Sequence, residues 1–171
     1  MADYIKDLRQ APSKIKWASP NKIHLTLKFF GSITQETVDS ISKILLKVVS
    51  DQPRFNLTLK GIGGFPNLFR PRVIWLGFGG ETESLMRFHQ TIEQALALLG
   101  LPKEERPFHP HLTLGRNKWN QVNEPLYRLL SDWSKEETTP FGVEEVILFR
   151  SDLKPDGPVY TKLGVFPLKL I

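Results

Sequence analysis

The sequence predicts an α+β fold of two similar lobes, in which antiparallel strands carry a site and helices lie outside. Two observations support this prediction. The tetrapeptide His-Leu-Thr-Leu occurs at residues 24–27 and again at 111–114. The order motif strand, helix, strand, loop, strand also occurs twice, beginning at each copy. We therefore expect a single domain, residues 1–171, whose two lobes are related by a pseudo-twofold axis and each contribute one motif strand to a central groove.

Each motif alternates polar and apolar residues, which is typical of a strand with one buried face. Successive side chains of a strand point to opposite faces. His24 and Thr26 should therefore share one face, while Leu25, Leu27 and Phe29 occupy the other and the leucines anchor the strand in a core. The same pattern predicts a second strand from Phe108 to Arg116, with His111 and Thr113 on one face. Two such strands would present two imidazoles and two hydroxyls to one cleft.

Apolar spacing, together with Gly and Pro residues, predicts the other elements. Ser32 and Gln35 form a capping box before one helix, and Thr82 can cap another. In the second helix His89 lies beside the apolar stripe, and we interpret it as a boundary residue without a chemical role. The expected elements are helices at 3–10, 33–50, from 82 to before 100 and after 125, strands at 14–17, 55–60, 73–78, 143–149 and 159–166, and a loop at 61–71.

Composition limits the class of protein. Lys and Arg number 23 against 18 Asp and Glu, which gives a net charge of +5 and favours a phosphate-bearing substrate only weakly. There is no cysteine, so a disulfide framework is excluded, and no apolar run approaches the ~20 residues of a membrane span. We expect a cytoplasmic protein without a membrane partner.

Two histidines and two threonines suit phosphoryl chemistry. One imidazole can activate water as general base while the other protonates the departing alkoxide as general acid, each contributing roughly 10²- to 10⁴-fold. The threonine hydroxyls can hold non-bridging phosphate oxygens. In-line displacement requires the entering and leaving oxygens to lie opposite each other, which two pseudosymmetric strands would provide.

Two alternatives use the same residues differently. His24, His109 and His111 could form a three-histidine zinc site, but neither motif histidine has an obvious carboxylate or cysteine partner in sequence, and the recurring threonine would go unexplained. A non-catalytic RNA-binding protein could use Phe30, Phe65 and Phe108 for stacking. Binding alone does not need a proton donor paired with an acceptor, so the two complete motifs argue against this second alternative.

Three segments resemble a known family. Residues 17–31, residues 65–67 together with 70–75, and residues 109–116 are similar to the motif regions of the 2H phosphoesterase superfamily, in its RNA 2′,3′-cyclic phosphodiesterase branch, also called 2′-5′ RNA ligase. The resemblance implies a bilobal fold with the groove between the lobes, and neither metal nor cofactor. It also implies opening of an RNA 2′,3′-cyclic phosphate to a 2′-phosphomonoester, with reversible 2′-5′ ligation as a second activity. A small cyclic nucleotide or a 2′-5′ oligonucleotide stays open as the substrate, and we expect a monomer.

The resemblance also assigns roles. It makes His24 the proton donor to the leaving 3′-oxygen and His111 the base acting on water, with Thr26 and Thr113 holding the phosphate. Further substrate-binding residues are expected to be Arg116, Arg72, Phe30 and Phe108. Strict alternation from His111 would turn Arg116 to the wrong face, so its role requires a bend or bulge at Gly115. The family begins with an apolar strand before its first helix, whereas this chain starts inside that helix, so its sheet is expected to be one strand short.

Overall fold

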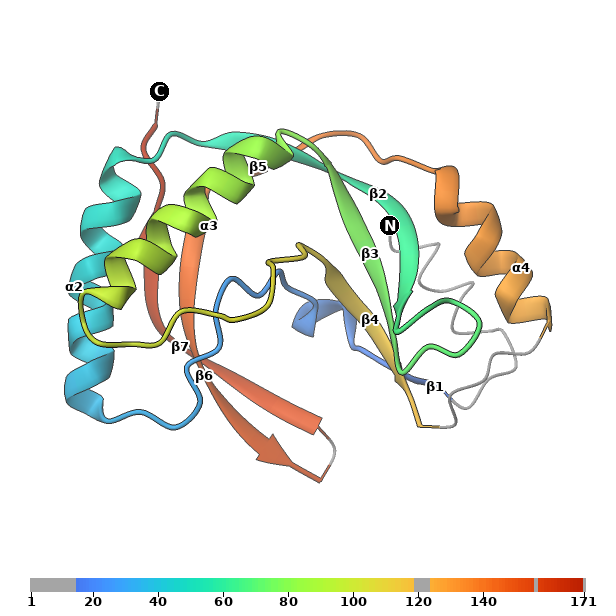
Figure 1. Cartoon of the computed structure of the whole chain (residues 1–171), viewed down its shortest axis with the longest axis horizontal. Helices are drawn as coiled ribbons and strands as arrows, with labels where there is room; N and C mark the ends of the chain where they lie inside the picture. The colour runs from blue at the N-terminus through green and yellow to red at the C-terminus, as the bar shows by residue number, and fades with distance from the viewer. Residues whose placement is uncertain (1–14, 119–123, 156, 171) are drawn as a thin grey trace. The chain divides into compact units, whose positions relative to one another are not determined.

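A computed structural model describes residues 15–118, 124–155 and 157–170 (Figure 1). Contacts divide the chain into two compact units. Within the described residues, unit 1 consists of the chain up to Thr26 with Leu57–Gly80 and His109–Pro140, and unit 2 consists of Leu27–Asn56, Glu81–Phe108 and the chain from Phe141 onward.

An antiparallel sheet forms the framework of unit 1. Its neighbouring strands are, in order, β1 (Ile15–Trp17), β4 (Leu112–Asn117), β3 (Val73–Gly80) and β2 (Phe55–Phe65). The short strand β5 (Phe141–Val143) belongs to unit 2. Unit 1 also contains the 3₁₀ turns η1 (Pro20–Lys22) and η2 (Trp133–Lys135) and the helix α4 (Glu124–Asp132).

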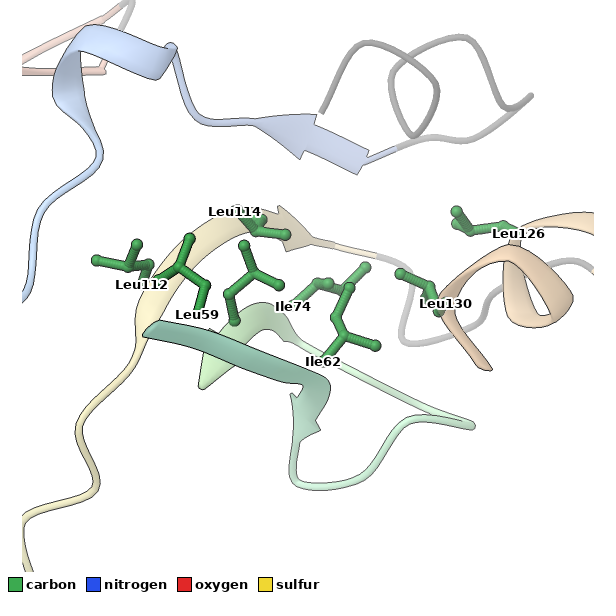
Figure 2. Close-up of a cluster of buried hydrophobic side chains, with 8 residues drawn as sticks. Leu59, Ile62, Ile74, Leu112, Leu114, Leu126 and Leu130 are labelled. Atoms are coloured by element: carbon green, nitrogen blue, oxygen red, sulfur yellow. The ribbon is translucent and has the colours of Figure 1, made fainter. Parts of the chain in front are cut away.

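One face of this sheet is buried against α4. Alternate residues of the strands point to the same side, and Leu126 and Leu130, four residues apart on α4, lie on one helix face and are fully buried. Figure 2 shows this cluster, which consists of Leu59, Ile62, Ile74, Leu76, Leu112, Leu114, Leu126 and Leu130. The strand residues that alternate with these positions point to the opposite face of the sheet. The polar residues of the candidate site lie on that face.

The loop predicted at 61–71 is partly wrong, because β2 continues to Phe65. The register with β3 shifts between Leu59 and Ile62, and Gly61 within this irregularity has φ +69°. Gly63 pairs with Trp75, and a Cβ at Gly63 would overlap the Trp75 indole. The glycines here mark a bulge and a close approach, not a loop.

Unit 2 is built from two helices and a hairpin. α2 (Gln35–Asp51) contacts α3 (Thr82–Ala97) and both strands of the hairpin, β6 (Glu145–Lys154) and β7 (Gly157–Pro167). Their buried apolar side chains include Ile41, Leu45, Val49, Leu85, Phe88, Ile92, Leu96, Leu148 and Phe166. The predicted capping box is displaced, because the hydroxyl of Thr34, not that of Ser32, caps α2 by accepting from the Thr37 N–H at 3.2 Å.

The repeated element order is confirmed, but the assignment of one motif to each lobe is wrong. Both His-Leu-Thr-Leu motifs fall in unit 1, apart from the last leucine of the first copy. The reason is strand pairing: β3 of the first repeat pairs with β4 of the second, while α2 of the first repeat packs on the β6–β7 hairpin of the second. The two repeats therefore exchange elements between the units.

The helix predicted at 3–10 lies outside the described residues. Of the helices that are described, none is both long and apolar enough to cross a bilayer.

Candidate active site

The two motifs meet through their leucines. Leu25 forms an isolated antiparallel bridge with Leu112, the first residue of β4. The strand predicted around residues 24–27 is therefore wrong in extent, since this segment makes one bridge and no ladder, and the second strand begins at Leu112 and not at Phe108. Phe29, which alternation assigns to the face of Leu25 and Leu27, is 72% exposed.

The bridge brings the two motifs side by side within unit 1. An antiparallel register through it would set His24 opposite Thr113 and Thr26 opposite His111. Leu112 belongs to the hydrophobic cluster and Leu25 packs against it, so the neighbouring polar residues of each motif are expected on the other face.

Both histidines are held by the same local hydrogen bond. His24 Nδ1 donates to the Lys22 carbonyl at 2.9 Å, and His111 Nδ1 donates to the His109 carbonyl at 2.6 Å. A carbonyl oxygen only accepts, so Nδ1 carries the hydrogen in both rings. In the neutral imidazole, Nε2 is then the acceptor, and the protein has fixed the same tautomer twice. Nε2 is therefore the nitrogen suited to exchange a proton with a substrate.

Aromatic rings form a wall beside His111. Its ring meets Phe65 edge-on with centroids 5.3 Å apart, and Trp75 lies 6.2 Å away. Trp75 pairs with Thr113 across β3 and β4, so both share the site face. The Trp75 indole N–H is buried and has no hydrogen-bond partner among the described residues, so packing alone holds this ring. Trp75 was not predicted as a site residue from the sequence. Its position between the apolar residues Ile74 and Leu76 nevertheless indicates that its side chain points to the face opposite theirs.

The predicted irregularity near Gly115 is confirmed. Ile74 pairs with Gly115 but Trp75 pairs with Thr113, which leaves Leu114 as an extra residue in β4. Leu114 and Gly115 are both buried while Arg116 is exposed, so the bulge returns Arg116 to the face of Thr113.

A second cation accompanies Arg116, because Lys16 of β1 pairs with it directly. Lys16 was also missed, since alternation shows only that it lies opposite Ile15 and Trp17. Which strand β1 joins is a long-range contact that local alternation does not contain.

Arg72 lies in unit 1 at the end of the β2–β3 loop. Its side chain is exposed, its N–H donates to the Phe65 carbonyl at 2.7 Å, and its carbonyl accepts from the Asn117 N–H at 2.9 Å. Phe30 and Phe108 belong to unit 2. Phe108 stacks on His89 with centroids 3.8 Å apart, and the substrate-binding role of both phenylalanines stays a prediction.

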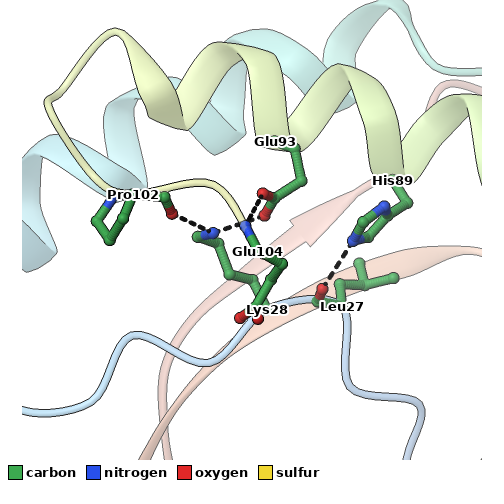
Figure 3. Close-up of polar contacts among 6 residues, drawn as sticks. All are labelled: Leu27, Lys28, His89, Glu93, Pro102 and Glu104. Carbon is green, nitrogen blue, oxygen red and sulfur yellow. Dashed lines mark hydrogen bonds and ion pairs between the residues drawn. The ribbon is translucent and has the colours of Figure 1, made fainter. Parts of the chain in front are cut away.

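A polar cluster in unit 2 anchors the chain beside both motifs (Figure 3). Lys28 Nζ lies 2.7 Å from Glu93 of α3 and donates to the Pro102 carbonyl at 2.9 Å. The Glu104 N–H donates to Glu93 at 3.1 Å. The side chains of Lys28 and Glu93 are only 5% and 11% exposed. This ion pair therefore ties the segment after Thr26 and the segment before Phe108 to one helix.

His89 is part of the same layer, and its interpretation as a boundary residue is wrong. It is 8% exposed, and its Nε2 donates to the Leu27 carbonyl at 3.0 Å. Burial lowers the pKa of His89 below its usual range, although Glu93 nearby acts in the opposite direction. Burial also acts to raise the pKa of Glu93, but the hydrogen bonds from Lys28 and the Glu104 N–H outweigh it and lower that pKa.

The zinc alternative finds no support in the geometry. Across the described ranges, no three His, Asp or Glu side chains gather as metal ligands would. His109 does contribute to the site, but through its backbone carbonyl, which orients His111.

Comparisons with known proteins agree with this geometry. The chain is 32% identical over 161 residues to the RNA 2′,3′-cyclic phosphodiesterase of Methanothermobacter thermautotrophicus, covering 94% of this chain and 86% of the relative. It is 34% identical over 157 residues to the protein of the same name from Aquifex aeolicus, covering 90% and 81%.

Two solved structures are similar over nearly the whole chain. A crystal structure of a Thermus thermophilus protein has a TM-score of 0.79 at 28% identity, covering 98% of this chain and 90% of that one. The structure of E. coli LigT complexed with 3′-AMP has a TM-score of 0.76 at 25% identity, covering 98% and 92%. The family model described as the 2′-5′ RNA ligase superfamily matches residues 2–155, and this chain belongs to that superfamily.

Proposed function

We propose that this chain is an RNA 2′,3′-cyclic phosphodiesterase that opens the cyclic phosphate to a 2′-phosphomonoester by acid–base catalysis with His24 and His111. The observation that carries the proposal is the pairing of the two motifs across Leu25 and Leu112, with each histidine donating from Nδ1 to a carbonyl two residues earlier. Curated relatives named for this activity, similar over most of the chain, support it.

The reaction uses one histidine on each side of the phosphorus. His111 Nε2 accepts a proton from water as the water oxygen bonds to phosphorus. The bond from phosphorus to the 3′-oxygen breaks, and His24 Nε2–H donates its proton to that oxygen, so the product carries a 2′-phosphate and a 3′-hydroxyl. The hydroxyls of Thr26 and Thr113 and the guanidinium of Arg116 hold the non-bridging oxygens, whose charge they stabilise.

The same groups account for ligation. If a 5′-hydroxyl replaces water, His111 accepts its proton and the 3′-oxygen leaves as before, which forms a 2′-5′ phosphodiester. Microscopic reversibility gives the reverse reaction with the two histidines in exchanged roles. Neither direction requires a metal ion. All four motif residues lie within one unit of a single chain, so the proposed site needs no residue from a second chain. We propose a monomeric enzyme of the cytoplasm.

The proposal is tested by incubating the purified protein with 2′,3′-cyclic nucleotides and with a cyclic-phosphate-ended RNA in EDTA. We expect hydrolysis of the RNA, with the 2′-phosphomonoester as the product identified by chromatography against both isomers. A 3′-phosphate product would contradict the assignment of the 3′-oxygen as leaving group. Activity that vanishes in EDTA and returns with zinc would replace the acid–base mechanism by a metal-dependent one.

A further inference from the structure

Two chain segments that lead directly into the motifs meet at one side chain of unit 2, that of His89. Leu27 is bonded to Thr26 of the first motif, and its carbonyl accepts from His89 Nε2 at 3.0 Å. Phe108 is bonded to His109, and its ring lies parallel to that of His89, with centroids 3.8 Å apart and 4° between the planes. One buried imidazole therefore contacts the chain at the end of the first motif and the chain at the approach to the second.

The backbone pairing between the motifs leaves room for such a contact to matter. Leu25 and Leu112 form an isolated bridge, and one bridge fixes the point at which two segments meet but not the angle between them. Because the bridge is antiparallel, the residues that follow Leu25 run alongside the residues that precede Leu112. Leu27 and Phe108 are therefore reached from the bridge in the same direction. A ring bound to both supplies a second fixed point for the two segments.

This second fixed point acts on the backbone that orients a motif histidine. The His109 carbonyl, which accepts from His111 Nδ1 at 2.6 Å, belongs to the residue next to Phe108. Each peptide unit is planar and nearly rigid. A displacement of Phe108 from the His89 ring would therefore be passed to His109, and from its carbonyl to His111.

The helix α3 supports His89 with a second contact to the same two segments. His89 and Glu93 are four residues apart and so lie on one face of this helix. Glu93 lies 2.7 Å from the Nζ of Lys28, the residue after Leu27, and accepts from the Glu104 N–H at 3.1 Å (Figure 3). One helix face therefore holds both the chain that leaves the first motif and the chain that approaches the second.

We propose that His89 is a positioning residue, which fixes the separation of the two motifs, and so of the proposed acid and base, by binding the Leu27 carbonyl and stacking on Phe108. The inference rests on the proposed function and adds to it a residue that acts through the backbone. A displacement of about 1 Å caused by a change far from the chemistry can cost about 10²-fold in rate. A change at His89 should therefore slow proton transfer more than it weakens substrate binding.

The test separates kcat from KM for a 2′,3′-cyclic nucleotide. His89→Phe keeps a ring on Phe108 but removes the donor to Leu27, and His89→Gln keeps a donor but removes the ring. Each should lower kcat about 10-fold and leave KM within about two-fold. Phe108→Leu removes the stack from the other side and should resemble His89→Gln. The double variant should lose little more than either single one, because both changes break the same contact.

A matched control distinguishes loss of positioning from loss of stability. Val49 is buried on α2 in unit 2, so Val49→Ala destabilises the same unit while both contacts of His89 are kept. Each variant is assayed at the same interval below its own melting temperature. Under that condition Val49→Ala should keep the kcat of the wild type.

A second measurement does not depend on activity. Nitrogen NMR of the imidazole rings at alkaline pH, where they are neutral, reports which nitrogen carries the hydrogen. In the wild type His111 should carry it at Nδ1, bound to the His109 carbonyl. In His89→Gln and Phe108→Leu the His111 signals should move toward a mixture of the two tautomers. Val49→Ala should leave them unchanged.

The outcomes distinguish the two proposals. If the wild-type protein turns over no cyclic phosphate, the proposed function fails, and the tautomer measurement still decides whether His89 positions His111. If the His89 variants lose no more kcat than Val49→Ala does, His89 has only a packing role and the inference is overturned. A rise in KM at constant kcat would overturn it as well, because the contacts would then act on binding. Selective loss of kcat with altered His111 signals supports the positioning role.

Discussion

The two units use histidine in opposite ways. In unit 1, His24 and His111 each donate from Nδ1 to a carbonyl of their own segment. In unit 2, His89 donates from Nε2 to the carbonyl of Leu27 and stacks on Phe108 in a buried layer. The first arrangement directs Nε2 to chemistry, whereas the second uses it for structure. The proposed catalytic histidines therefore differ from the structural one in the ring nitrogen that donates a hydrogen bond to the backbone.

The contrast extends to what each histidine controls. In the proposed reaction His24 and His111 act through proton transfer, so their removal should affect turnover and not folding. His89 and Glu93 hold Leu27, the last residue of the first motif, and Glu104, which precedes the second motif. Their removal should affect stability first.

The largest expected effect is on turnover. His24→Ala and His111→Ala should each lower kcat by roughly 10²- to 10⁴-fold, the contribution of a positioned acid or base. The double variant should lose little more than either single one, because the pair acts as a unit. Single-turnover kinetics on a cyclic-phosphate-ended RNA measure this, with thermal melts showing that the fold is retained. Losses that add in log kcat would argue against concerted action.

The next effect concerns the buried ion pair of unit 2. Glu93→Gln leaves the Lys28 ammonium buried without its counter-charge, which should reduce the free energy of unfolding by about 3 kcal/mol. Urea denaturation measures the loss. Glu83→Gln is the control on the same helix: its partner Arg87 and Glu83 itself are 69% and 90% exposed, so that change should cost less than about 1 kcal/mol. Equal losses in the two variants would show that the Lys28–Glu93 pair has no special role.

Acid should weaken the same layer in two stages. The pKa of His89 is lowered by burial, so the unfolded chain binds a proton that the folded chain does not as pH falls below 6.5, and stability decreases with falling pH in that range. Glu93, whose pKa is lowered despite its burial, adds a further loss below 4.5. The other charged groups facing His89 are Lys28 and Glu104, which act on its pKa in opposite directions.

This is tested with His89→Gln, which keeps a side-chain donor near Leu27 and does not titrate. Melting temperatures measured from pH 7.5 to 5 should fall less steeply for the variant than for the wild type. His109→Gln changes an exposed histidine, and its melting temperature should fall in parallel with that of the wild type. A His89→Gln curve parallel to that of the wild type would show that His89 does not titrate differently in the folded state.

Much of the site could be predicted because it follows local rules. Alternation within the second motif predicted that Thr113 lies on the face opposite Leu112, and the need for a bulge before Arg116 followed from counting residues. The predictions that failed depend on contacts between residues far apart in the sequence. No local pattern shows that β3 pairs with β4, and that pairing places both motifs in one unit. Gly63 was interpreted as a loop residue because the Trp75 indole that fills its space comes from another strand.

The smallest expected effect tests whether the aromatic wall positions His111. Trp75→Phe removes part of the surface that packs beside the imidazole, while the His109 carbonyl still orients the ring. We expect kcat to fall several-fold with KM nearly unchanged, because a small displacement of the base weakens proton transfer more than substrate binding. Trp17→Phe, whose side chain packs against the hydrophobic cluster on the other face, should lower stability without that selective loss of kcat. If both variants lose kcat in proportion to stability, the wall has only a packing role, and the single Nδ1 hydrogen bond is sufficient to hold the base.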